Sequence, residues 1–308
     1  MSITSDHIGV RVRQSKGAVP GAFAARAQVS AHALALILAL ALLGPATAQE
    51  TPPGAPPPAT ASSFLLTLTV PQDIVDFTVD NLGNIYVLNA DNQLKKLGPK
   101  GDSLAVFNDV RRYGKITRVD VSNPLKILVY YREFTTVIEL DRFLNMINTI
   151  DLRKQNILQA KAIGLAYDNS VWVFDELDAV LKRVGDDGSL VDQTTDFRQL
   201  FDSVPDPTII CDQGGLVYLY DPTKGVYIFD HYGTLKTHLD LRGWEDFDVI
   251  GNNLLGRDDR KFYRYQPGTL NMQEEPIPAS YQGATRIHIT PTIIYVLKKT
   301  GLEVYSRK

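Results

Sequence analysis

The chain has 308 residues, of which 44% are hydrophobic, and a formal net charge of −3 at pH 7. This slightly acidic balance excludes general nucleic-acid binding, which requires a basic surface. Cys211 is the single cysteine, so no internal disulfide can form and the fold must rely on its core. Because no neighbouring residue in the sequence would activate the thiol, we expect Cys211 to be buried and inert.

The first 48 residues have the pattern of an export signal. Basic residues at positions 11, 13, 16 and 26 precede an apolar stretch over 33–43, and small residues follow at 46–48. This order is typical of a cleaved signal peptide, and eleven apolar residues are too few to span a bilayer. We therefore expect residues 1–48 to be removed. The mature protein would be periplasmic or extracellular, without direct insertion into a membrane.

A proline- and alanine-rich segment follows over residues 49–63. Such a segment favours an extended chain and cannot build a core, so we interpret it as a linker. The remaining residues, 64–308, are predicted to form one domain. Without the four basic residues and one acidic residue of the leader, the chain carries 28 Lys and Arg against 34 Asp and Glu.

One short motif then repeats to the end of the chain. Each copy is an apolar run that ends in a polar residue. The six copies occupy residues 85–89, 128–132, 171–175, 217–221, 253–257 and 294–298. The ends of successive runs are 43, 43, 46, 36 and 41 positions apart. A period near this length, built from short strands, is typical of a β-propeller blade. The sequence therefore predicts an all-β, six-bladed propeller.

Each repeat divides into four strand-like pieces, separated by Gly, Asn and Asp clusters that close hairpins. In the first repeat these pieces cover 76–80, 85–88, 93–97 and 103–107, and the innermost would line a central channel. The last repeat has only three pieces. Residues 64–70 precede the first repeat and have no other place in it, so we predict that they supply the missing outer strand and close the ring.

This pattern resembles the six-bladed propellers of the NHL-repeat and related TolB-like superfamilies. The match is best in the first repeat, over residues 79–87, 93–97 and Gly101, and weakest in the fifth, where Leu254-Leu255-Gly256 lacks an aromatic residue. The resemblance implies the propeller fold. Its members include peptide-chemistry enzymes, lactonases and binding modules, so it leaves the activity open.

The propeller topology places the last residue of each run at one end of the channel. These residues are Asn89, Arg132, Asp175, Asp221, Arg257 and Lys298. They could cap strands and pair with their neighbours, or form a polar binding rim. Longer connections between blades would reach the same end and carry Trp, Tyr and Arg, which often anchor protein interfaces. The predicted partner-binding residues are Arg111, Arg112, Tyr113, Arg132, Asp175, Asp221, Trp244, Asp246, Arg257 and Arg260.

The predicted innermost strands offer weak candidates for a metal site. Asp76, Asp120, Asp248 and His288 lie on four of these strands, where we find no glutamate. The lactonase resemblance implies a Glu, Asn and Asp set around a divalent ion. That set is incomplete here, although Asp120 and Asp248 could serve as channel carboxylates. No Gly-x-Ser-x-Gly motif or phosphate-binding glycine loop occurs.

These observations favour a non-catalytic binding or scaffold module without a cofactor. We expect a protein partner, in an envelope or outer-membrane complex, to bind one face of the propeller. One alternative is a metal-dependent, lactonase-like hydrolase that uses a divalent cation in the channel. The other is a glycan- or peptide-binding module in which Trp244 and Tyr113 stack on the ligand.

Overall fold

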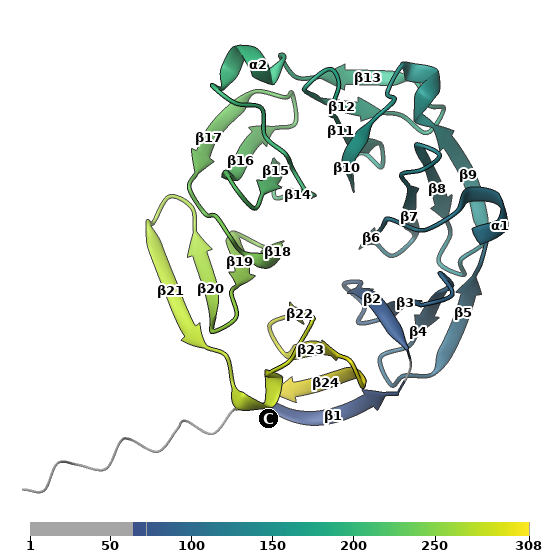
Figure 1. Ribbon diagram of the computed structural model, residues 1–308, viewed down its shortest axis with the longest axis vertical. Helices are drawn as coiled ribbons and strands as arrows, with labels where there is room; N and C mark the ends of the chain where they lie inside the picture. The colour runs from purple at the N-terminus through teal and green to yellow at the C-terminus, as the bar shows by residue number, and fades with distance from the viewer. Residues whose placement is uncertain (1–63, 72, 308) are drawn as a thin grey trace, which may run out of the picture. The chain divides into compact units, whose positions relative to one another are not determined.

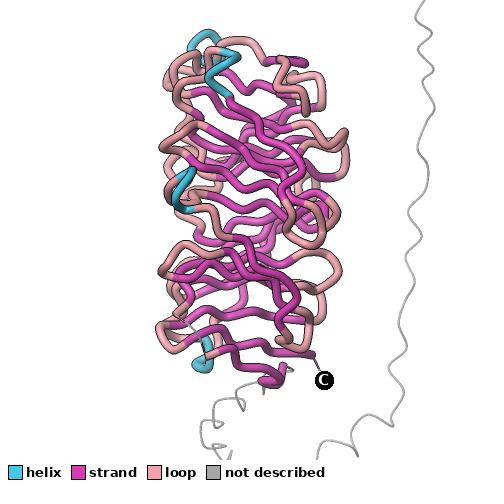
Figure 2. The backbone as a smooth tube through the Cα atoms, turned by 90° about the vertical axis from the view of Figure 1, so that its right-hand side faces the viewer, coloured by secondary structure: helices cyan, strands magenta, loops and turns pink. Residues whose placement is uncertain are grey.

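The computed structural model describes residues 64–71 and 73–307, which form a six-bladed β-propeller. Six four-stranded antiparallel sheets surround a central channel (Figure 1). Seen from the side, the strands of neighbouring blades stack along the ring, and loops lie at its two ends (Figure 2). The fold predicted from the repeat is confirmed.

In blades 1 to 3 the strands follow one another from the channel outward. Blade 1 consists of β2 (Ile74–Val79), β3 (Ile85–Asn89), β4 (Leu94–Leu97) and β5 (Ser103–Phe107). Blade 2 consists of β6 (Arg118–Asn123), β7 (Lys126–Tyr131), β8 (Thr136–Leu140) and β9 (Met146–Asp151). Blade 3 consists of β10 (Ala160–Leu165), β11 (Val171–Asp175), β12 (Val180–Val184) and β13 (Leu190–Gln193).

Blades 4 and 5 repeat this order. Blade 4 consists of β14 (Ile209–Gln213), β15 (Leu216–Asp221), β16 (Gly225–Asp230) and β17 (Leu235–Leu239). Blade 5 consists of β18 (Glu245–Ile250), β19 (Asn253–Arg257), β20 (Lys261–Gln266) and β21 (Asn271–Pro276). Four short helical turns lie between blades: α1 (Val110–Tyr113), η1 (Leu152–Gln155), α2 (Phe197–Leu200) and η2 (Ala279–Tyr281).

The sixth blade joins strands from opposite ends of the domain. Its inner strands are β22 (Arg286–Ile289), β23 (Ile293–Lys298) and β24 (Gly301–Arg307), and its outer strand is β1 (Phe64–Val70). β1 pairs antiparallel with β24, from Phe64 opposite Arg307 to Val70 opposite Leu302. The register shifts once, between Leu66 and Leu68. The ring is therefore closed as the incomplete last repeat predicts.

Six hydrophobic clusters lie between adjacent blades and hold the ring together. Every residue of β7 and of β11 is buried, because these second strands are covered on both faces by neighbouring blades. Trp172 on β11 is only 1% exposed, as expected for a core residue. The apolar runs in the sequence are thus the interfaces between blades.

The loops separate into two ends of the channel. We call the end that carries the turns between second and third strands, together with the blade-to-blade segments, the connection end. Asn92, in the β3–β4 turn, binds the carbonyl oxygen of Gly114 (3.0 Å) and the amide of Ile116 (2.8 Å) in the segment that leads to blade 2. The opposite end, with the remaining hairpin turns, is the hairpin end. No helix in the described part of the chain is long and apolar enough to cross a membrane.

Candidate functional site

Two of the predicted rim carboxylates are buried. Asp175 and Asp221 are both 0% exposed, so they cannot contact a partner on the surface of this structure. Asp175 forms an ion pair with Lys182 (2.7 Å) on the neighbouring strand. Asp221 accepts hydrogen bonds from the Asp206 amide (2.7 Å) and from the amide and hydroxyl of Thr223 (2.7 Å each). The prediction that these two side chains face a partner is corrected: they stabilise the turns that follow their strands.

Arg257 is a third rim residue that lies inside the fold. It is 5% exposed and forms ion pairs with Glu245 (2.7 Å) and Asp246 (2.6 Å). Asp246 also accepts a hydrogen bond from the Ile287 amide (2.7 Å), which joins blade 5 to blade 6. Glu245 is the first residue of β18, so the innermost strands do include one glutamate, contrary to the sequence interpretation.

The two aromatic residues predicted to stack on a ligand are also buried. Trp244 is 7% exposed and stacks on Tyr263, with ring centroids 5.4 Å apart and an angle of 6° between the planes. A Cβ atom on Gly256 would lie 2.5 Å from the Trp244 ring, so only glycine leaves room for it. This contact explains why the fifth run has glycine at position 256. Tyr113 is likewise 7% exposed and packs against Tyr131.

Exposed cations remain at the connection end of blades 1 and 2. Arg111 and Arg112 lie on α1, Lys115 follows it, and Arg132 lies in the turn after β7; all four are exposed. We call these four residues the basic arc. Among the residues that the structure describes, none forms an ion pair with them. Arg260 is also exposed, but it belongs to blade 5, across the ring from blade 2 (Figure 1).

A small pocket lies at the mouth of the channel, lined in part by the residues that directly follow Lys115 of the basic arc. Arg118 and Arg286, the first residues of β6 and β22, line it together with Asp76 on β2. Arg286 forms an ion pair with Asp76, and its guanidinium carbon lies 5.8 Å from the centre of the Phe77 ring. Neither arginine was predicted from the sequence to be a site residue. The only signal available was a basic residue at the start of a strand that faces the channel.

The channel carboxylates do not assemble into a metal site. No group of three or more His, Cys, Asp or Glu side chains that could hold a metal ion occurs within 64–71 and 73–307. Asp120 accepts hydrogen bonds from Leu165 (2.9 Å) and Ser122 (2.9 Å to its amide), and Asp248 lies 3.4 Å from His288. Burial lowers the pKa of His288 below its ordinary value, although the Asp248 carboxylate opposes this shift.

Cys211 lies on β14 and is partly buried as a free thiol. Burial raises the pKa of this thiol, and the nearby Asp248 carboxylate adds to the rise. A raised pKa keeps the sulfur protonated at neutral pH, so it is a poor nucleophile and a poor metal ligand.

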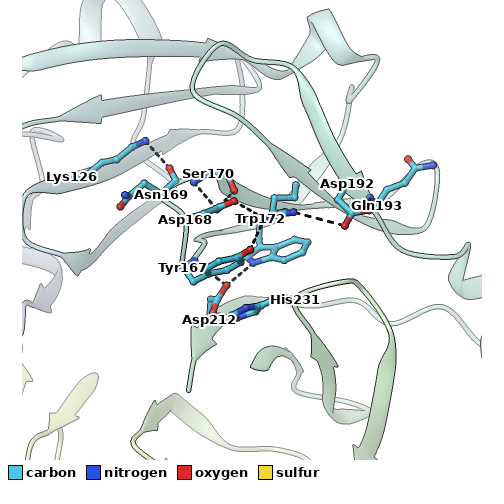
Figure 3. A network of polar contacts seen from close by, with 11 residues as sticks. Lys126, Tyr167, Asp168, Asn169, Ser170, Trp172, Asp192, Gln193, Asp212 and His231 are labelled. Atoms are coloured by element: carbon cyan, nitrogen blue, oxygen red, sulfur yellow. Dashed lines mark hydrogen bonds and ion pairs between the residues drawn. The ribbon is translucent and has the colours of Figure 1, made fainter. Parts of the chain in front are cut away.

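The hairpin end carries a polar network that the sequence did not reveal (Figure 3). Asp212 accepts hydrogen bonds from Trp172 Nε1 (2.9 Å) and the Tyr167 amide (3.1 Å), and its other oxygen lies 2.9 Å from His231 Nε2. The Tyr167 and His231 rings stack with centroids 3.9 Å apart. These contacts join blade 3 to blade 4. Lys126 links blade 2 to blade 3 in a similar way, through the carbonyl of Asn169 (2.7 Å).

Comparison with known proteins supports the fold alone. No family model matches the chain, and no curated protein matches its sequence. The chain is similar in structure to virginiamycin B lyase from Staphylococcus aureus, with 12% identity, a TM-score of 0.53, and coverage of 76% of this chain and 80% of that one. It is also similar to the Neurospora crassa Pan2 WD40 domain, with 12% identity, a TM-score of 0.53 and coverages of 76% and 75%.

A third similar structure is the β-propeller domain of Cps50 (Swd1) from Myceliophteria thermophila. It shares 8% identity and a TM-score of 0.55, and the match covers 80% of this chain and all of that domain. The resemblance to propeller superfamilies is thus confirmed at the level of the fold. At such low identities, the functions of these proteins do not carry over to this chain.

Proposed function

We propose that this chain is an exported, non-catalytic binding or scaffold propeller that engages an acidic segment of a protein partner through the basic arc. The observation that carries this proposal is the set of four exposed cations without ion pairs on adjoining segments of blades 1 and 2. Arginine is enriched among the residues that contribute most to protein interfaces, and charge complementarity directs the choice of partner.

Three other cations at the connection end already form ion pairs within the described part of the fold, whereas Arg260 does not. Lys161 pairs with Asp206 (2.6 Å), Arg198 with Asp196 (2.9 Å), and Arg257 with the two carboxylates of β18. The basic arc differs because its charges have no such partners among the described residues. A protein partner with exposed carboxylates would supply the missing ion-pair partners of the basic arc.

We extend the proposal to the location of the protein. The leader at 1–48 and the linker at 49–63 lie outside the residues that the structure describes, and the expectation of export rests on their sequence. The linker would hold the propeller at a distance from its surroundings. The proposed partner is a component of a cell-envelope or outer-membrane assembly.

The test is affinity purification of the tagged protein from its native envelope, with mass spectrometry of the retained proteins. The triple variant Arg111→Glu, Arg112→Glu, Arg132→Glu should retain its partner more than about tenfold less strongly than the wild type, because like charges would then face each other. The matched control reverses three other exposed cations, Lys100, Arg142 and Arg264, and should retain the partner normally. Equal retention by the two triple variants would refute the basic arc as the binding surface.

A further inference from the structure

A charge imbalance at the channel mouth is not explained by the fold. Two guanidinium groups, those of Arg118 and Arg286, line one small pocket, but only one carboxylate, that of Asp76, lines it with them. Arg286 pairs with Asp76. Arg118 forms no hydrogen bond or ion pair with any residue in the described part of the chain, and its Nε atom is enclosed without a hydrogen-bond partner.

The enclosed Nε group of Arg118 is unfavourable without a partner, since this N–H gives up a hydrogen bond to water without regaining one. The nearby Asp120 does not relieve this cost: it accepts hydrogen bonds from Leu165 and Ser122, and none joins it to Arg118 in the described part of the chain. Guanidinium groups bind carboxylates in a planar, two-pronged geometry. The unmet bonding capacity of Arg118 is therefore suited to an anion from outside the chain.

The walls of the pocket narrow the choice of ligand. Apolar side chains from Leu88, Leu94, Ile116 and Val119 line it beside the two arginines. The enclosed space of the pocket is about that of one water, so it can admit the head of a single carboxylate but not a sugar ring or a nucleotide. The segment that carries α1 and Lys115 continues directly into Ile116 and Arg118, so the pocket and the basic arc share one stretch of chain.

We propose that the Arg118–Arg286 pocket binds the carboxylate of a glutamate or aspartate side chain. That this side chain belongs to the protein partner rests on the function proposed above. The partner's acidic segment would lie along the basic arc and insert one carboxylate into the channel mouth. The arc would then attract the segment, and the pocket would fix its position.

The test uses isothermal titration of the propeller with a blocked Gly-Glu-Glu-Gly peptide, its Gln-for-Glu counterpart, and acetate. The wild type should bind the Glu peptide, and both the Gln peptide and acetate should bind at least about tenfold more weakly. Arg118→Gln should weaken binding of the Glu peptide about tenfold or more, and Arg118→Lys should weaken it less. Arg264→Gln, an exposed cation on β20, is the matched control and should bind normally.

A second variant tests the pocket without removing an arginine. Thr78 lines the pocket from β2, so Thr78→Glu would supply a carboxylate from the chain itself. We expect this variant to lose peptide binding and to unfold at a higher temperature than the wild type. A Thr78→Glu protein that still binds the peptide would contradict the proposal.

The results of these experiments can refute the carboxylate pocket and the basic-arc function independently of each other. If acetate binds as well as the Glu peptide, the ligand is a free small carboxylate and the protein source is wrong. If the wild type binds neither, the site itself is refuted. Loss of peptide binding in Arg118→Gln would support the pocket as a carboxylate site. Normal partner retention by the basic-arc triple variant in the same study would refute the basic arc as the partner-binding surface.

Discussion

At the scale of single residues, polar side chains at the ends of buried runs serve the turns that follow them. Asp221 is the clearest example, since its carboxylate receives several hydrogen bonds while fully buried. Burial alone would raise the pKa of this carboxyl. The hydrogen bonds from the Asp206 amide and from Thr223 outweigh burial and hold the pKa below its ordinary value of 3.8.

This lowered pKa predicts how stability depends on pH. Asp221→Asn should reduce the free energy of unfolding by about 1–3 kcal/mol at pH 7. The side-chain NH₂ group of the asparagine would then face the hydrogen-bond donors of Asp206 and Thr223. The contribution of the ionised carboxylate is complete above pH 3.8 and is lost as pH falls through the lower folded-state pKa. Urea unfolding of both proteins between pH 7 and pH 3 should therefore show a difference that shrinks on acidification.

The control for this experiment is Asp259→Asn, which changes an exposed carboxylate on blade 5 and should cost less than about 0.5 kcal/mol. A loss for Asp221→Asn that stays constant down to pH 3 would show that its charge is not the cause.

At the scale of elements, the pairing of β1 with β24 depends on a close approach of two backbones. Gly301 opens β24 with a φ of +129°, and a Cβ atom on it would lie 2.4 Å from the carbonyl oxygen of Val70. Any other residue at position 301 would have to adopt an unfavourable backbone conformation and also push β1 away.

We predict that Gly301→Ala lowers the free energy of unfolding by about 3 kcal/mol or more. Gly283→Ala is the control: its φ is +76°, but a Cβ atom there would meet nothing within 4 Å. It should cost only the backbone strain, about 1–2 kcal/mol. Thermal unfolding followed by circular dichroism would measure both, and equal losses would contradict the predicted clash at the closure.

At the scale of the whole molecule, the ring is stable only if every blade contacts two neighbours. Deletion of residues 64–70 would leave β24 with an open edge and remove Val70, which is 4% exposed, from the cluster between blades 6 and 1. We predict that this deletion abolishes cooperative unfolding. Deletion of residues 49–63 is the control and should leave the unfolding curve unchanged. Cooperative unfolding at the wild-type temperature after removal of 64–70 would contradict the role of β1.

The sequence predicted the architecture because a propeller repeats one local pattern. Apolar runs, turn residues and their spacing are properties of each segment, so six blades and the closing strand followed from them. The exposure of side chains at the connection end depends instead on contacts between distant residues. Asp175 is buried in an ion pair with Lys182, and Trp244 is buried because Gly256 leaves it space. Arg118 was missed for the same reason, since only the assembled channel shows that it has no partner.

The pairing of β1 with β24 also sets the order of events during synthesis. Phe64 leaves the ribosome early, whereas its partner Arg307 is made more than two hundred residues later. A growing chain can form individual blades but cannot complete the circle, and contacts so distant in sequence form slowly. If the protein is exported as proposed, this delay would help to keep the chain open until it has crossed the membrane.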